Sequence, residues 1–178
     1  LAEFMDWARQ DPAMVLNIEV KSFPDQPDLC PAPDTAVAAI LDVIARHGGT
    51  NPLVVSSFDW RVLTALRAAA PDVARGYLSY AQPGADCTIY AGSPWMAGLS
   101  LDDAGGSLPH LIAAQGGLCW CPHYSDLTEA ALRQAHDAGL AVNVWTVNSP
   151  DDLSAMVSLG VDGIITDYPQ RAMPLVRV

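Results

Sequence analysis

The chain has 178 residues, of which 51% are hydrophobic and 16% charged, and its net charge is −11. This apolar composition excludes a mainly disordered chain, because disorder requires low hydrophobicity. The negative charge argues against nucleic-acid partners, since an acidic surface repels phosphate backbones. No apolar run approaches the ~18 residues that a membrane helix requires. The first residues also lack the basic and then apolar pattern of a secretion signal.

Short apolar runs alternate along the chain with segments whose apolar residues recur at helical spacing. The expected elements, in order, are a helix over 1–10, a strand over 15–20, a helix from Asp34 or Thr35 to Gly48-Gly49, a strand over 53–57, a helix from Asp59 to Ala70, a strand over 74–79, a short helix over 108–114, a helix from an Asp126–Glu129 capping box to Gly139, a strand over 142–147, a helix from Ser149 to Gly160 and a strand over 163–166. Leu118–Cys121 is ambiguous, and residues 81–106 are expected to form a long loop of the kind that often covers a site.

Strands that alternate with helices at this spacing predict a parallel sheet covered by helices. Neither GxGxxG nor GxxxxGK[ST] occurs, which weakens a doubly wound nucleotide-binding fold. The fold class expected is therefore α/β, a (β/α)8 TIM barrel. Because five clear strands cannot close a barrel of eight, we expect residues 1–178 to be a single partial domain, roughly the C-terminal five-eighths of the barrel.

The first strand carries a pair of opposite charges at its carboxyl end, within Asn17-Ile18-Glu19-Val20-Lys21. Alternate side chains of a strand share a face, so Glu19 and Lys21 are expected to point together. In barrel enzymes the carboxyl ends of the strands carry the active site. A carboxylate suits a hard cation, and a metal together with a lysine suits a phosphoryl oxygen. A structural ion pair is the alternative reading of the same residues.

The four cysteines are Cys30, Cys87, Cys119 and Cys121. Cys119 and Cys121 are separated by one residue, whereas zinc knuckles and redox motifs usually have two between their cysteines. We therefore interpret all four as buried free thiols, which suit a reducing compartment and favour a cytoplasmic protein.

Four segments together resemble the glycerophosphodiester phosphodiesterase family. NIEVK resembles the motif at the family's fourth strand, and VVSSFDW with Leu63 is similar to the SF segment at its next strand. LTEAALRQAHDAGLAVNVWTVN is similar to the family's late helix and WTVN strand, and GVDGIITDYP resembles its closing strand. The resemblance covers residues 1 to about 170, in the family's order.

The resemblance implies a TIM-barrel hydrolase that uses a divalent cation, Ca²⁺ or Mg²⁺, to cleave glycerophosphodiesters into an alcohol and glycerol 3-phosphate. By position in these motifs, Glu19 would be a carboxylate ligand of the metal and Lys21 would contact the phosphate. Phe58 and Trp145 would line the substrate cleft. The resemblance implies a small-molecule glycerophosphodiester as the partner and leaves the oligomeric state open.

The family's earlier strands supply an HRG segment, an ExD pair of metal ligands and an HD segment, and none of these precedes the NIEVK strand. Of the four histidines, only His123 follows a possible strand and could approach the barrel mouth; the others are placed on helices, and His136 lies where a helix C-terminus favours a cation. We therefore expect the catalytic histidines upstream and the printed chain to be inactive alone.

Two alternatives remain open at this point. One is a non-catalytic half-barrel whose unpaired strand edges bind or assemble with a partner. The other is a phosphate-binding barrel of a biosynthetic enzyme, because GVDGII is superficially similar to a late strand of such enzymes. The Gly- or Ser-rich phosphate loop that should follow is replaced here by Thr166-Asp167-Tyr168-Pro169.

Overall fold

The computed structural model describes residues 1–176. The described chain divides into two compact units, one of residues 1–76 with 93–98 and one of residues 77–92 with 99–178. The hydrogen-bonded order of the six strands is the order of the chain, β1 to β6. The ladders β1–β2, β4–β5 and β5–β6 are all parallel, which confirms the parallel α/β class.

The first unit alternates helices and strands. Its elements are α1 (Ala2–Ala8), β1 (Leu16–Glu19), the 3₁₀ turn η1 (Pro27–Leu29), α2 (Pro33–His47), β2 (Leu53–Ser57), α3 (Trp60–Ala69) and the 3₁₀ turn η2 (Pro94–Met96). Strand β3 (Ala74–Ser79) begins in this unit and ends in the other.

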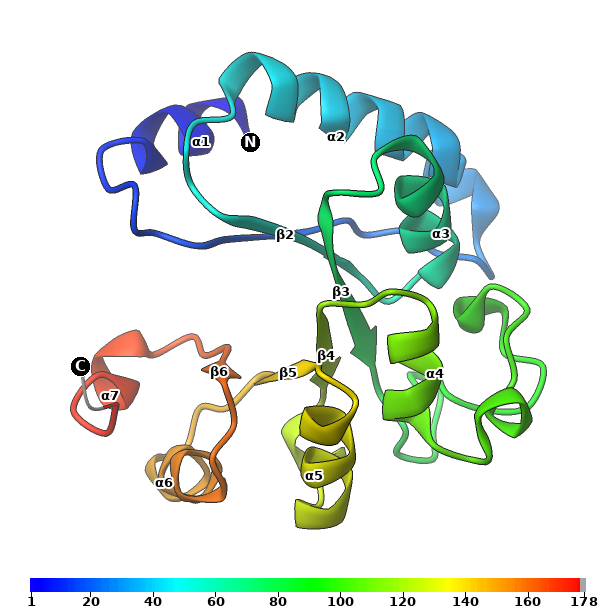
Figure 1. Ribbon diagram of the computed structural model, residues 1–178, viewed down its shortest axis with the longest axis vertical. Coiled ribbons are helices and arrows are strands. Elements are labelled where there is room, and N and C mark those ends of the chain that lie inside the picture. The colour runs from blue at the N-terminus through cyan, green and yellow to red at the C-terminus, as the bar shows by residue number, and fades with distance from the viewer. Residues whose placement is uncertain (177–178) are drawn as a thin grey trace. The chain divides into compact units, whose positions relative to one another are not determined.

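The core of the first unit lies between its helices and one face of β1 and β2, and Figure 1 shows α1 and α2 along one side of β2. Leu16 and Ile18 alternate in β1 with exposed residues and pack in one cluster with Met5 of α1 and Val37 of α2. The alternation follows from the two-residue period of a strand. It leaves the opposite face of β1 for polar side chains.

The second unit repeats the pattern. Its elements are η3 (Leu101–Ala104), α4 (Leu108–Ala114), β4 (Cys119–Pro122), η4 (Tyr124–Asp126), α5 (Glu129–Asp137), β5 (Ala141–Val144), α6 (Pro150–Leu159), β6 (Gly163–Ile164) and α7 (Pro169–Ala172). Figure 1 shows α5 and α6 on the same side of β5. On β5 Val142 and Val144 are fully buried, whereas Asn143 between them is partly exposed. No helix among residues 1–176 is long and apolar enough to cross a membrane.

Several local predictions are confirmed at their exact bounds, including β2, β3 and α4. The ambiguous segment around Cys119–Cys121 is strand β4, so the sheet of the described residues has six strands, whereas five were clearly predicted. Gly160 ends α6, as expected, and adopts a left-handed conformation with φ +89°. The loop expected over 81–106 contains the two short 3₁₀ turns η2 and η3.

Other predictions about helix ends were wrong. Helix α2 ends at Gly48 as expected, but Gly48 is extended, with φ −62°, and does not form the left-handed cap that is common for a glycine at this position. Helix α2 begins at Pro33, whose fixed φ suits a first helical position, so neither Asp34 nor Thr35 caps it. Thr128, whose hydroxyl accepts from the amide of Ala131, caps α5 in place of the expected capping box.

Candidate functional site

Glu19 and Lys21 lie on the same face at the carboxyl end of β1. The Lys21 Nζ atom donates to Glu19 Oε1 at 2.9 Å. The side chains are 33% exposed for Glu19 and 72% exposed for Lys21, so both charges remain open to solvent and to ligands. The expectation that the two charges point together is confirmed. An ion pair this exposed contributes little to stability, which weakens a purely structural reading.

The same face of the sheet carries further polar side chains, on β1 before Glu19 and on β2. Asn17, two residues before Glu19, accepts a hydrogen bond through Oδ1 from Ser56 Oγ at 2.9 Å. Ser56 is the register partner of Glu19 in the parallel ladder. The side chains next to the Glu19 carboxylate on this face are therefore polar, and a hydrogen bond between β1 and β2 fixes them.

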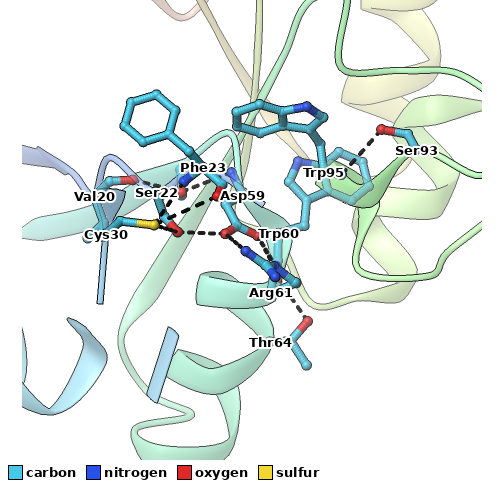
Figure 2. A network of polar contacts seen from close by, with 11 residues as sticks. Val20, Ser22, Phe23, Cys30, Asp59, Trp60, Arg61, Thr64, Ser93 and Trp95 are labelled. Atoms are coloured by element: carbon cyan, nitrogen blue, oxygen red, sulfur yellow. Dashed lines mark hydrogen bonds and ion pairs between the residues drawn. The ribbon is translucent and has the colours of Figure 1, made fainter. Parts of the chain in front are cut away.

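A buried carboxylate, Asp59, anchors the segment that follows Lys21 (Figure 2). Ser22 Oγ donates to Asp59 Oδ2 at 2.7 Å, and Arg61 donates through Nε and Nη2 at 2.9 and 2.7 Å. The Asp59 side chain is fully buried and also caps α3 by accepting from the backbone N–H of Arg61. Hydrogen bonding to this carboxylate raises the pKa of Arg61 above its ordinary value.

The same network fixes the backbone just beyond Ser22. Cys30 Sγ lies 3.6 Å from Ser22 Oγ and accepts from the backbone N–H of Phe23 at 3.3 Å. The sequence predicted only the helix-capping role of Asp59. Its link to Ser22 spans 37 positions, and no local pattern could have indicated it.

Replacing Asp59 by alanine is expected to lower the free energy of unfolding by about 2–4 kcal/mol, because a helix cap and charged hydrogen bonds are lost together. Urea unfolding followed by tryptophan fluorescence measures the change. Asp42→Ala is the matched control, since Asp42 forms an ion pair with Arg46 that is exposed on both sides. Its effect should stay within about 0.5 kcal/mol. Equal losses in the two variants would contradict the anchoring role.

Phe58 follows β2 directly and belongs to the first unit. It is partly exposed, whereas its neighbours Asp59 and Trp60 are buried.

In the second unit, Trp145 lies in an aromatic cluster at the carboxyl ends of three strands. Tyr80, His123 and Trp145 follow β3, β4 and β5 directly. The His123 ring lies edge-on to Trp145 with centroids 4.9 Å apart, and Tyr80 lies 5.1 Å from His123. Trp145 Nε1 donates to the carbonyl of Cys121 at 2.8 Å, which orients the indole. The sequence singled out Trp145 and His123 but missed Tyr80, which only the strand order brings beside them.

Two of the other histidines form contacts at the surface. His47 Nδ1 lies 3.1 Å from a carboxylate oxygen of Asp6, and His136 Nε2 lies 2.9 Å from Asp162. His110 is exposed on α4. Only His123 stands at the carboxyl end of a strand, as the sequence indicated. His123 Nδ1 lies 2.7 Å from Ser125 Oγ.

All four cysteines are free thiols, as expected, but only Cys119 and Cys121 are buried. Their sulfur atoms lie 3.7 Å apart on one face of β4. The hydrogen bond between them lowers the pKa of Cys119, whereas that contact and burial raise the pKa of Cys121.

Within residues 1–176 no group of three or more His, Cys, Asp or Glu side chains is arranged to hold a metal ion. Glu19 could supply one carboxylate, and its nearest charged partner is a lysine rather than a second acid. The donor set present in this chain therefore fits one part of a cation site and cannot complete it.

The chain matches the Glycerophosphoryl diester phosphodiesterase family over residues 1–171. A glycerophosphodiester phosphodiesterase from Caldanaerobacter subterraneus subsp. tengcongensis is 25% identical over 138 residues, which are 78% of this chain and 48% of that protein. The chain thus spans about half the length of the curated relatives it matches.

Solved structures of phosphodiesterases share the fold. A crystal structure from Silicibacter pomeroyi DSS-3 that carries the family's name superposes with a TM-score of 0.76 and 36% identity, over 98% of this chain and 55% of that one. An Oleispira antarctica phosphodiesterase in complex with the product sn-glycerol-3-phosphate has a TM-score of 0.73 and 23% identity, over 98% of this chain and 60% of that one.

Proposed function

The chain belongs to the glycerophosphoryl diester phosphodiesterase family, and from that premise we propose that it is part of a metal-dependent hydrolase that cleaves glycerophosphodiesters into an alcohol and glycerol 3-phosphate. The observation that carries the proposal is the exposed Glu19–Lys21 pair at the end of β1, within the motif that resembles the family's fourth strand. The family match also argues against the alternative hypothesis that the chain is a phosphate-binding barrel of a biosynthetic enzyme.

Each proposed site residue has one role. Glu19 contributes a carboxylate oxygen to a divalent cation, Ca²⁺ or Mg²⁺, which as a Lewis acid neutralises charge on the phosphate. Lys21, whose ammonium is well exposed, contacts a phosphoryl oxygen. Phe58 and Trp145 contact carbon atoms of the substrate. The ion pair orients the Glu19 carboxylate, because one of its oxygens is held by Lys21 while the other remains open.

We propose further that the complete enzyme is a (β/α)8 barrel of which this chain is the C-terminal part. The remaining metal ligands and the two histidines that act as acid and base then belong to the family's HRG, ExD and HD segments. The outer face of α1 supports this, because Phe4 and Trp7 are 47% and 53% exposed and lie against each other with ring centroids 5.8 Å apart. Exposed aromatic patches of this kind mark surfaces that another segment covers.

A cytoplasmic location is proposed on the ground of the free thiols, because a reducing compartment keeps cysteines unpaired. This proposal is independent of the hydrolytic one.

The test uses what we call the extended chain, which is the printed sequence preceded by the part of its reading frame that carries the HRG and ExD segments. With Ca²⁺ or Mg²⁺, the extended chain should release glycerol 3-phosphate from glycerophosphodiesters, and EDTA should abolish the release. The printed chain alone should release none. An extended chain that is folded, carries both segments and hydrolyses no glycerophosphodiester in either metal would overturn the proposal in favour of a non-catalytic, partner-binding half-barrel.

A further inference from the structure

Two aromatic rings stand beside the proposed phosphate-binding residue without a role in the function described so far. Phe23 follows Lys21 by two positions and is 38% exposed. Its ring meets that of Trp95 edge-to-face, with centroids 6.5 Å apart and an interplanar angle of 83° (Figure 2). Trp95 comes from the long Gly- and Pro-rich segment, and it belongs to the same compact unit as Phe23.

Hydrogen bonds and buried residues fix the backbone that carries the two rings. Ser22 is buried and donates to Asp59, while Cys30 accepts from the amide of Phe23, so the backbone under Phe23 is fixed on both sides. The turn η2 is anchored by the buried Ser93, whose hydroxyl accepts from the backbone N–H of Trp95, and by the buried Met96. The backbone that carries both rings is therefore fixed, which lowers the ordering cost that a ligand binding there has to offset.

Phe23 lies on the same exposed side of its segment as Glu19 and Lys21. Exposure alternates from β1 into the following segment, with Glu19, Lys21 and Phe23 exposed and Ser22 buried. The alternation of exposure continues past Glu19, where β1 ends, and Phe23 is therefore the next exposed side chain of this row after Lys21. A phosphate held by Lys21 would thus place one of its ester groups over the rings.

The segment that carries Phe23 is acidic apart from Lys21, whose ammonium is paired with Glu19. No lysine or arginine occurs between Lys21 and Arg46, whereas Asp25 and Asp28 are exposed in the segment beside Phe23. The whole chain carries a net charge of −11. Aromatic faces attract a cation that is weakly hydrated, and quaternary ammonium groups are the ligands for which this interaction counts most.

Resting on the proposed function, we propose that Phe23 and Trp95 form the subsite for the alcohol moiety of the substrate, and that this subsite selects an alcohol with a quaternary ammonium group. The pair is then a specificity determinant, while the cation and Lys21 act on the phosphate that all glycerophosphodiesters share.

The experiment compares two substrates on the extended chain, glycerophosphocholine and glycerophosphoglycerol, whose alcohols differ in charge. Trp95→Leu and Phe23→Leu should each lower kcat/KM for the choline ester by about tenfold, and for the glycerol ester by less than about twofold. Trp95→Phe should restore most of the preference for choline. Free choline should inhibit the unsubstituted chain competitively, and either leucine variant should raise its inhibition constant by about the same tenfold factor. Tyr90→Leu is the matched control, since Tyr90 is an exposed aromatic residue of the same long segment, and it should leave both rates unchanged.

The possible failures are distinguishable. If the extended chain hydrolyses neither ester, the proposed function itself fails. If it hydrolyses both and the leucine variants lose activity on them equally, or retain the choline preference, the subsite is refuted while the hydrolase stands. Because Phe23 and Trp95 are replaced separately, misfolding of one variant still leaves a decisive result from the other.

Discussion

Replacing Glu19 by glutamine in the extended chain should lower kcat/KM for glycerophosphocholine by about 1,000-fold, because a metal ligand contributes several kcal/mol of transition-state stabilisation. Glutamine keeps the size of the side chain and removes its charge. Glu19 is part of an exposed ion pair, so the fold should tolerate the change and unfold at the same urea concentration.

Glu129→Gln is the matched control for this variant. Glu129 is also an exposed acid paired with a basic side chain, Arg133, but it lies on α5. The control should retain full activity. A loss of activity of less than about threefold in Glu19→Gln would be far smaller than the loss expected for a metal ligand. The assignment of Glu19 as a metal ligand would then be wrong.

Replacing Lys21 by methionine should lower kcat/KM by about 10–100-fold, since a charged hydrogen bond to an anion contributes about 1.5–3 kcal/mol. Within residues 1–176, the Lys21 Nζ atom donates a hydrogen bond only to the Glu19 carboxylate. Methionine keeps the length of the side chain without its charge.

The variant Lys21→Arg tests whether the rate depends on the positive charge at position 21 or on the compact shape of the ammonium. A guanidinium retains the charge but not the compact ammonium, so it should recover part of the rate. Arg133→Met on α5 removes a comparable exposed charge elsewhere and should have no effect. Equal activities of the methionine and unsubstituted chains would show that the phosphate is held without Lys21.

Much of the fold follows from local patterns. Periodic apolar residues located the helices, and the caps at Asp59 and Ser149 were found because each is satisfied by a backbone N–H two or three residues away. The segment Cys119–Pro122 could not be assigned from sequence, since four buried residues in a row carry no alternation. Its assignment as a strand depends on pairing with β5, which is a non-local interaction.

The site residues likewise fall into two groups, those that a local pattern places and those that only the tertiary structure brings together. Glu19 and Lys21 could be placed together because a strand has a period of two residues, and their 2.9 Å contact follows from that. The contacts of Phe23 with Trp95 and of Ser22 with Asp59 join segments that only tertiary structure brings together. Tyr80 beside His123 is a further example, because the two residues follow different strands.

The most direct test of the account is the binding of Mn²⁺ to the extended chain, followed by electron paramagnetic resonance. Mn²⁺ accepts the same oxygen ligands as Ca²⁺ and Mg²⁺. One tight Mn²⁺ site is expected, whose affinity falls by about 100-fold or more in Glu19→Gln and is unchanged in Glu129→Gln. Equal Mn²⁺ affinities in the Glu19→Gln and unsubstituted chains would contradict it.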